Sequence, residues 1–205
     1  MNLRSQPWNG ENAYIIGGGS SLHHFDWNLL KSENTIGCND AYKLGEEICK
    51  VCIFGDYSWW QHHKDRLSEY KGVVVTNACG LASEKPSWVN YFERQPTGLF
   101  RNSLGWNGNT GASALNLALI LGAKRIYLLG FDMGIIKGKT NWHDEIIHKS
   151  AVLPSSYDMF LDRWKHVVKD LENKFPNREV INVNDDSRLY GIPTISTKTF
   201  WKETP

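Results

Sequence analysis

Short runs of mostly apolar residues recur along the chain and predict β-strands. Each run is four to six residues long and bounded by polar or glycine-containing turns, a pattern typical of buried strands. The predicted strands are residues 13–16, 35–38, 51–54, 73–76, 125–130 and 179–183.

Helical signals lie between these runs. Residues 115–121 are almost entirely apolar, which predicts a buried helix. Ser155 or Ser156 is a candidate N-cap for the last long helix, and Pro176 ends it. One apolar face of that helix is predicted from Phe160, Trp164, Val167, Val168 and Leu171. Shorter helices are expected at residues 25–30, 41–48 and 58–70.

The alternation of strands and helices predicts a Rossmann-like α/β fold, with a mostly parallel sheet and helices on both faces. The 205 residues suit a single domain that spans positions 1–205. Residues 77–109 and 133–154 are expected to be irregular, and 190–205 a tail of turns. Loops of such length within a domain are usually functional.

Composition narrows the function classes. The net charge of +1 gives no broad basic face for nucleic acid or an anionic membrane. We see no apolar stretch that approaches a membrane span and no apolar core of a signal peptide, so we expect a cytoplasmic protein without a membrane span. The oligomeric state is open, and a homo-oligomer is compatible with the sequence.

No metal site is expected from the cysteines or histidines. Cys38, Cys52 and Cys79 lie in or beside strand-like segments and are expected to be reduced core thiols; Cys49 and Cys52 have metal-knuckle spacing but no second pair. His143 and His148 are five residues apart, too far for one zinc on a single helix face.

A glycine-rich loop follows the first predicted strand. Gly17 and Gly19 fit the first two glycines of a dinucleotide-binding loop, whereas Leu22 occupies the position of the third. Glycine lets the backbone approach a phosphate closely, and serine hydroxyls add donors. Phosphate contacts are therefore predicted from Gly17, Gly18, Gly19, Ser20 and Ser21. The alternative is a tight turn between strand and helix.

Two further turns complete a candidate nucleotide site. Asn109, Thr110 and Gly111 open the apolar helix, where N–H groups without partners and the helix dipole favour a phosphate. Asn39 and Asp40 end the second strand and are candidates for ribose or base contacts. Asp132 ends a later strand, where α/β sheets bind ligands. We expect the three turns to meet at one cleft.

Several of these motifs, in this order, resemble a known group of proteins. They are residues 17–22, 38–42, 109–111, 126–132, 140–143 and 180–189. The set resembles the domain shared by motility-accessory-factor glycosyltransferases and MptE-like 6-hydroxymethylpterin pyrophosphokinases. It is more distantly similar to bacterial lipooligosaccharide sialyltransferases that use CMP-sialic acid, and many phage-encoded proteins resemble the group too. The resemblance extends from Tyr14 to about Ser196.

The resemblance implies roles for particular residues. The glycine-serine loop would hold nucleotide phosphate, Asn39 would bind ribose or base, and Asp132 would line the centre of the crevice. Asn109, Thr110 and Ser187 would also belong to the nucleotide site. In the sialyltransferases a histidine after the Asp132 strand is the general base, which makes His143 the first candidate here and His148 the second.

The chain departs from the sialyltransferase pattern at two places. The tyrosine pair that follows the Gly-Phe-Asp strand is replaced by residues 133–135, and Asn107 stands where those enzymes carry an arginine. The first departure removes groups that help the phosphate to leave, and both bear on which donor is used.

Three functions remain open. The first is a glycosyltransferase with a nucleotide-linked donor, such as a CMP-linked acidic sugar, and a histidine base for an undefined acceptor. The second is Mg²⁺/ATP-dependent pyrophosphoryl transfer to a pterin-like alcohol, with Asp132 and Asp56 on the metal. The third is a nucleotide-binding module without catalysis, such as a phage accessory protein. Without a D-x-D motif, we expect metal-independent transfer and no resident cofactor.

Overall fold

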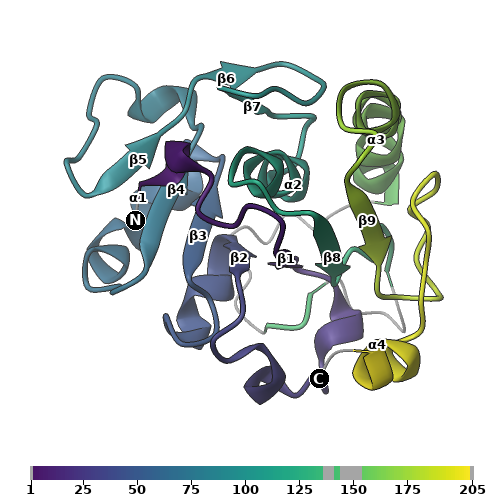
Figure 1. Ribbon diagram of the computed structural model, residues 1–205. Coiled ribbons are helices and arrows are strands. Elements are labelled where there is room, and N and C mark those ends of the chain that lie inside the picture. The colour runs from purple at the N-terminus through teal and green to yellow at the C-terminus, as the bar shows by residue number, and fades with distance from the viewer. Residues whose placement is uncertain (1, 136–140, 144–153, 204–205) are drawn as a thin grey trace.

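A seven-stranded parallel sheet forms the centre of the computed structural model, which describes residues 2–135, 141–143 and 154–203 (Figure 1). The strand order is β5-β4-β3-β2-β1-β8-β9, and every neighbouring pair is parallel. The strands are β1 (Asn12–Ile16), β2 (Thr35–Cys38), β3 (Val51–Phe54), β4 (Val73–Thr76), β5 (Val89–Tyr91), β8 (Arg125–Leu129) and β9 (Glu179–Asn182). A separate parallel pair is formed by β6 (Arg94–Gln95) and β7 (Leu104–Gly105). The fold is Rossmann-like, as predicted.

Helices in the described part of the chain are of two kinds. The α-helices are α1 (Tyr57–Ser68), α2 (Thr110–Ile120), α3 (Pro154–Lys174) and α4 (Thr197–Glu203). Short 3-10 helices fill several connections: η1 (Leu3–Ser5), η2 (Ser20–Leu22), η3 (Trp27–Leu30), η4 (Asn39–Leu44) and η5 (Cys79–Leu81).

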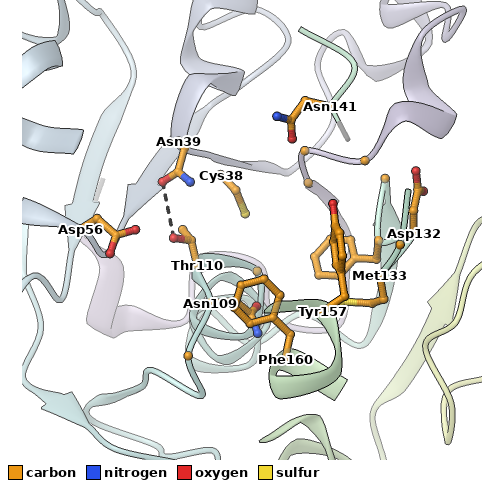
Figure 2. Close-up of a pocket in the computed structure, with 18 of the residues that line it drawn as sticks. Cys38, Asn39, Asp56, Asn109, Thr110, Asp132, Met133, Asn141, Tyr157 and Phe160 are labelled. Atoms are coloured by element: carbon orange, nitrogen blue, oxygen red, sulfur yellow. Dashed lines mark hydrogen bonds between the residues drawn. The ribbon is translucent and has the colours of Figure 1, made fainter. Parts of the chain in front are cut away.

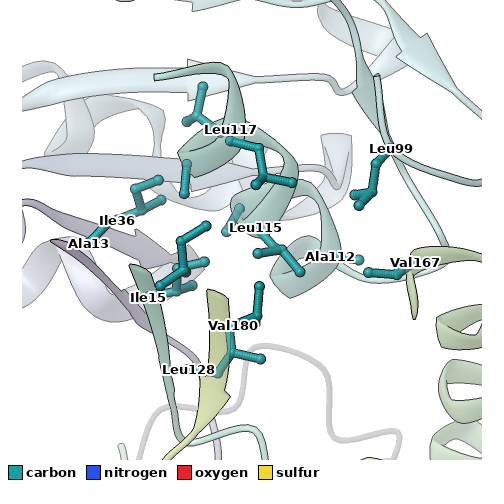
Figure 3. Packing of buried hydrophobic residues seen from close by; sticks show 14 of the residues in the cluster. Ala13, Ile15, Ile36, Leu99, Ala112, Leu115, Leu117, Leu128, Val167 and Val180 are labelled. Carbon is teal, nitrogen blue, oxygen red and sulfur yellow. The ribbon is translucent and has the colours of Figure 1, made fainter. Parts of the chain in front are cut away.

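Side chains alternate between the two faces of the sheet, and each face has its own core. Ile15 points toward α2 and α3, together with Ile36, Leu128 and Val180 (Figure 3). The opposite face carries Tyr14, which packs in a cluster with Phe200 of α4. Farther along that opposite face, buried residues of β3 and β4 cluster with buried aromatic residues of α1. Helices therefore cover both faces, as the sequence predicted.

Helix α2 is buried almost all around because the sheet lies beneath it and the loop that leads to β7 covers it. Asn116 is the polar residue that attaches this loop. Its Oδ1 accepts the N–H of Phe100 at 3.1 Å and that of Gly105 at 2.9 Å, and its Nδ2 donates to the Phe100 carbonyl at 2.7 Å. A buried amide with its donors and acceptors paired fixes the loop in one position.

Several local predictions were wrong. Residues 77–109 are not wholly irregular, since β5 adds an edge strand to β4 through the Val74–Val89 pair. The tail beyond residue 190 contains α4. In contrast, the short helices expected at 25–30 and 41–48 are present as the 3-10 helices η3 and η4, with different bounds. These segments are short, and tertiary pairing decides their conformation rather than periodicity.

The last long helix begins earlier than predicted. Its first residue is Pro154, so Ser155 and Ser156 lie inside the helix and do not cap it. Proline suits this position because the first helical N–H has no partner within the helix.

The cysteines follow the prediction only in part. Cys38, Cys49 and Cys52 are buried free thiols, whereas Cys79 is exposed. Burial raises the pKa of the Cys38 thiol well above its usual range, and Cys49 adds to the effect. Within residues 2–135, 141–143 and 154–203, none of the helices combines the length and apolar character that a bilayer crossing demands.

The order of connection changes at β1. The chain leaves β1 toward β2 and β3 on one side, and later places β8 on the other side of β1. In open α/β sheets, ligands bind beyond the carboxyl ends of the strands at such a switch point. The loops after β1 and β8 are therefore the place to look for a site.

Candidate functional site

A cavity of about 390 Å³ lies at this switch point (Figure 2). The turns after β1, β2, β3 and β8, the start of α2 and the first turns of α3 all contribute to its wall. Its lining residues are Gly17, Gly18, Gly19, Cys38, Asn39, Asp56, Trp106, residues 108–111, residues 130–134, Asn141, Tyr157 and Phe160. The three turns singled out in the sequence thus meet around one cavity.

The glycines after β1 do two different jobs. Gly17 and Gly19 donate backbone hydrogen bonds to the carbonyls of Leu129 and Gly130, both at 2.8 Å. A Cβ on Gly17 would lie 2.7 Å from the Gly130 oxygen, and one on Gly19 only 2.5 Å from Cγ of Asp132. A Cβ on Gly18 would meet only Oδ1 of Asn141, at 3.3 Å. Gly17 and Gly19 therefore let two loops pack closely, while Gly18 lines the cavity with only Asn141, among the described residues, close to where a Cβ would lie.

Ser20 and Ser21 do not line the cavity. The Ser21 N–H donates to Asp132 at 2.9 Å and its hydroxyl donates at 2.5 Å, while Asn184 donates to the same carboxylate at 2.7 Å. Asp132 is only 3% exposed. The hydroxyls of Ser20 and Ser21, from which phosphate contacts are predicted, are directed at the Asp132 carboxylate rather than at the cavity. Asp132 borders the cavity, but its carboxylate joins three segments of protein.

The start of α2 faces the cavity. Asn109 is the N-cap, and its Oδ1 accepts the N–H of Ala112 at 2.8 Å. Thr110 and Gly111 belong to the first turn, whose N–H groups have no partner within the helix. Gly111 has no room for a side chain, because a Cβ would lie 2.6 Å from the Phe131 ring. The helix therefore offers N–H groups and the positive end of its dipole to a bound anion.

Asn39 and Asp40 point to different environments. Asn39 has a left-handed backbone, with φ of 51°, and its Oδ1 accepts a weak bond from the Thr110 hydroxyl at 3.4 Å. Asp40 is buried and does not line the cavity. Its carboxylate lies 3.3 Å from Nζ of Lys43 and 3.3 Å from Nε2 of His63. The expected ribose or base contact is thus available to Asn39 but not to Asp40.

Residues 141–143 lie across the glycine turn. Trp142 donates its backbone N–H to the Gly18 carbonyl at 3.0 Å and its indole N–H to the Gly17 carbonyl at 2.9 Å. Asn141 lines the cavity, while Nδ1 of His143 lies 3.6 Å from a carboxylate oxygen of Asp40. His143 is next to the site but is not among its lining residues. His148 lies outside the described residues.

The Ser187 hydroxyl also forms its hydrogen bonds within the protein rather than facing the cavity. This hydroxyl donates to the Phe131 carbonyl at 2.6 Å and accepts the N–H of Leu189 at 3.0 Å. Ser187 therefore fixes the loop after β8 from behind, and it is not among the lining residues.

Asn107, which stands in place of the sialyltransferase arginine, is completely buried. Its Oδ1 accepts the N–H of Gly98 at 2.7 Å, and its Nδ2 donates to the Gly98 carbonyl at 3.0 Å. This residue shapes the loop before α2 and cannot reach a ligand.

Tyr157 also lines the cavity, although no motif in the sequence marks it. It comes from the first turns of α3, and its hydroxyl points into the cavity (Figure 2). Burial raises the pKa of Tyr157, and the negative charge of Asp132 adds to the effect. The phenol therefore stays protonated at neutral pH and can donate a hydrogen bond. Residues 133–135 stand where the sialyltransferases carry a tyrosine pair, but α3 brings a tyrosine to the cavity.

Comparison with known proteins finds the fold but no family. No protein-family model matches the chain, and no curated protein does. Two similar solved structures are described as the sialyltransferase CST-II in complex with trisaccharide acceptor and CMP, and the monofunctional alpha-2,3-sialyltransferase Cst-I from Campylobacter jejuni. The first has a TM-score of 0.53 at 16% identity, over 91% of this chain and 86% of that one. The second has a TM-score of 0.56 at 16% identity, over 90% and 80%.

Proposed function

We propose that this protein is a nucleotide-sugar-dependent glycosyltransferase that uses a CMP-linked acidic sugar as donor. The observation that carries the proposal is the meeting of the Gly18 turn, Asn39 and the start of α2 around one cavity at the sheet's switch point. The likeness of the fold to two sialyltransferases, one of them described with CMP and an acceptor, supports this choice of chemistry.

The donor phosphate binds between Gly18 and the start of α2. None of the lining residues that the structure describes is a lysine or arginine. The negative charge is therefore met by backbone N–H groups, the α2 dipole and side-chain amides. The Tyr157 hydroxyl donates a hydrogen bond to the phosphate as the bond to the sugar breaks, because negative charge on the leaving group grows at that point.

His143 takes the proton from the acceptor hydroxyl in this proposal. The acceptor oxygen then attacks the anomeric carbon, and the nucleoside phosphate leaves with the electrons of the broken bond. A carboxylate oxygen of Asp40 lies 3.6 Å from Nδ1 of His143, so in this proposal Nδ1 keeps its proton and Nε2 acts as the basic atom. His148 is the second candidate for this role.

Calorimetry with CMP, CTP and ATP, each with and without Mg²⁺, tests the proposal together with an assay of donor hydrolysis. We expect CMP to bind equally well in both conditions and a CMP-linked acidic sugar to be hydrolysed slowly. ATP binding that requires Mg²⁺ would point to pyrophosphoryl transfer instead. CMP binding without any turnover of donor, with or without acceptor sugars, would point to a binding module.

A further inference from the structure

The end of the cavity beyond β3 combines an exposed acid, Asp56, with an aromatic ring, Trp106. Asp56 follows β3 and occupies the N-cap position of α1. It is exposed and lines the cavity, and Figure 2 shows the carboxylate on the side of Asn39 and Thr110. An acid here repels a phosphate, so this end suits a neutral part of a ligand that carries hydrogen-bond donors.

Trp106 forms the aromatic part of the same end. The guanidinium carbon of Arg94 lies 4.2 Å from the centroid of the indole ring. Nε of Arg94 donates to the Asn77 carbonyl at 2.8 Å, and another of its nitrogens donates to the Gly55 carbonyl. A Cβ on Gly55 would lie 2.1 Å from the indole, so glycine is required there. The ring is therefore held in one position while part of it borders the cavity.

The order of groups along the sheet edge matches the order of parts in a nucleotide. β1, β2 and β3 are neighbours, and adjacent strands lie about 4.8 Å apart. The Gly18 turn follows β1, Asn39 follows β2 and Asp56 follows β3. A phosphate at Gly18 and the start of α2 would place the ribose near Asn39, with the base beyond it.

We infer that Asp56 and Trp106 form the base-binding end of the cavity and select cytidine over uridine. The base stacks on the indole, and its exocyclic amine donates to the Asp56 carboxylate. Uracil has a carbonyl at the position of this amine, which would place two acceptors against each other. The inference relies on the proposed function only for the presence of a nucleotide in the cavity.

Calorimetry with CMP and UMP on the wild-type protein, Asp56→Asn and Trp106→Ala tests the inference. We expect CMP to bind at least about 10-fold more tightly than UMP to the wild type, because a site built for a donor rejects an analogue that lacks it. Asp56→Asn should bring the ratio close to one, since an amide can face either base. Asp65→Asn, an exposed acid on α1 outside the cavity, is the matched control and should leave the ratio unchanged.

Trp106→Ala should weaken binding of both nucleotides by roughly 5- to 100-fold, the usual value of one aromatic stack. Trp106→Phe should keep most of the affinity. If the alanine variant does not fold, the indole N–H resonance of Trp106 in the wild type, assigned by its loss in the phenylalanine variant, gives the answer. It should shift when CMP is added.

An unchanged CMP-to-UMP ratio in Asp56→Asn would overturn the amine contact, and an unmoved Trp106 resonance would overturn the stack. Either result would leave the proposed transfer reaction standing. Conversely, selectivity that depends on Asp56, in a protein that turns over no donor, would keep this inference and remove the proposed function. Failure of both nucleotides to bind would remove both.

Discussion

Two acids at the carboxyl ends of strands border the same cavity in opposite ways. Asp132, after β8, is 3% exposed and its carboxylate accepts bonds from Ser21 and Asn184. Asp56, after β3, is exposed and lines the cavity. The first acid holds loops together and the second faces the space where a ligand would lie. Two aspartates at equivalent places thus differ in surroundings, since one carboxylate is bound within the protein and the other faces the cavity.

The largest expected effect is that of replacing His143, because this substitution removes the proposed general base. His143→Gln should lower the transfer rate about 10²- to 10⁴-fold with donor affinity unchanged, since loss of a general base affects proton transfer rather than binding. Steady-state kinetics with calorimetry would measure both quantities. His148→Gln should be measured in parallel, because a loss of rate in that variant alone would move the base to position 148.

Asp132→Asn tests whether the buried acid stabilises the fold. The new amide would present an N–H₂ group to donors that now bind a carboxylate, so we expect a loss of about 2–4 kcal/mol in the free energy of unfolding. Urea denaturation would measure it. A loss below about 0.5 kcal/mol would show that the hydrogen bonds around Asp132 do not stabilise the fold.

Alanine substitutions at Gly18 and Gly19 should affect different properties, one ligand binding and the other packing. Gly19→Ala should destabilise the fold by about 1–3 kcal/mol, because its Cβ would overlap Asp132 and the Gly130 carbonyl. Gly18→Ala should change stability much less and should weaken CMP binding instead. Thermal unfolding and calorimetry on both variants would check this, and equal destabilisation by both would contradict the division of roles.

Tyr157→Phe should lower the transfer rate about 10-fold with little change in stability. The raised pKa of Tyr157 means that the wild-type hydroxyl stays protonated well above neutrality, so the wild-type-to-variant ratio should be constant between about pH 6 and 9. Rates measured across that range would test it. A ratio that falls as pH rises within the range would mean that the phenol ionises there and is not the proposed donor.

Asp56→Asn should have the smallest effect on stability, within about 0.5 kcal/mol, because substitutions of exposed side chains usually change the free energy of unfolding little. Urea denaturation beside Asp132→Asn provides the contrast. Destabilisation of similar size in both variants would break the comparison between the two acids.

The sequence predicted the sheet well where strands are buried and apolar. The runs that became β1, β2, β3, β4, β8 and β9 stand out by hydrophobicity alone. The edge strand β5 does not, because three residues paired on one side only need no long apolar run. Helix α4 was missed for a related reason. It is short, and Phe200 buries it against Tyr14 and Tyr127 on the sheet, a contact that local periodicity does not reveal.

The position of the candidate site was predictable, but the use of its side chains was not. Parallel strands place their carboxyl ends on one edge, so the turns at Gly17, Asn39 and Asp132 had to lie near one another. Whether a polar group faces the cavity or the protein depends on neighbours that are distant in sequence, such as Asn184 beside Asp132. Tyr157 lies on α3, and the local sequence pattern does not predict how this helix is oriented relative to the cavity.

Trp142 has a consequence for how the site can respond to a ligand. Both of its N–H groups are bound to the glycine turn, so Asn141 in the cavity and His143 beside Asp40 share one anchor. A phosphate that displaced the turn by a fraction of an ångström would carry both flanking residues with it. Binding of a ligand in the cavity and the position of the histidine would then be coupled through this one tryptophan.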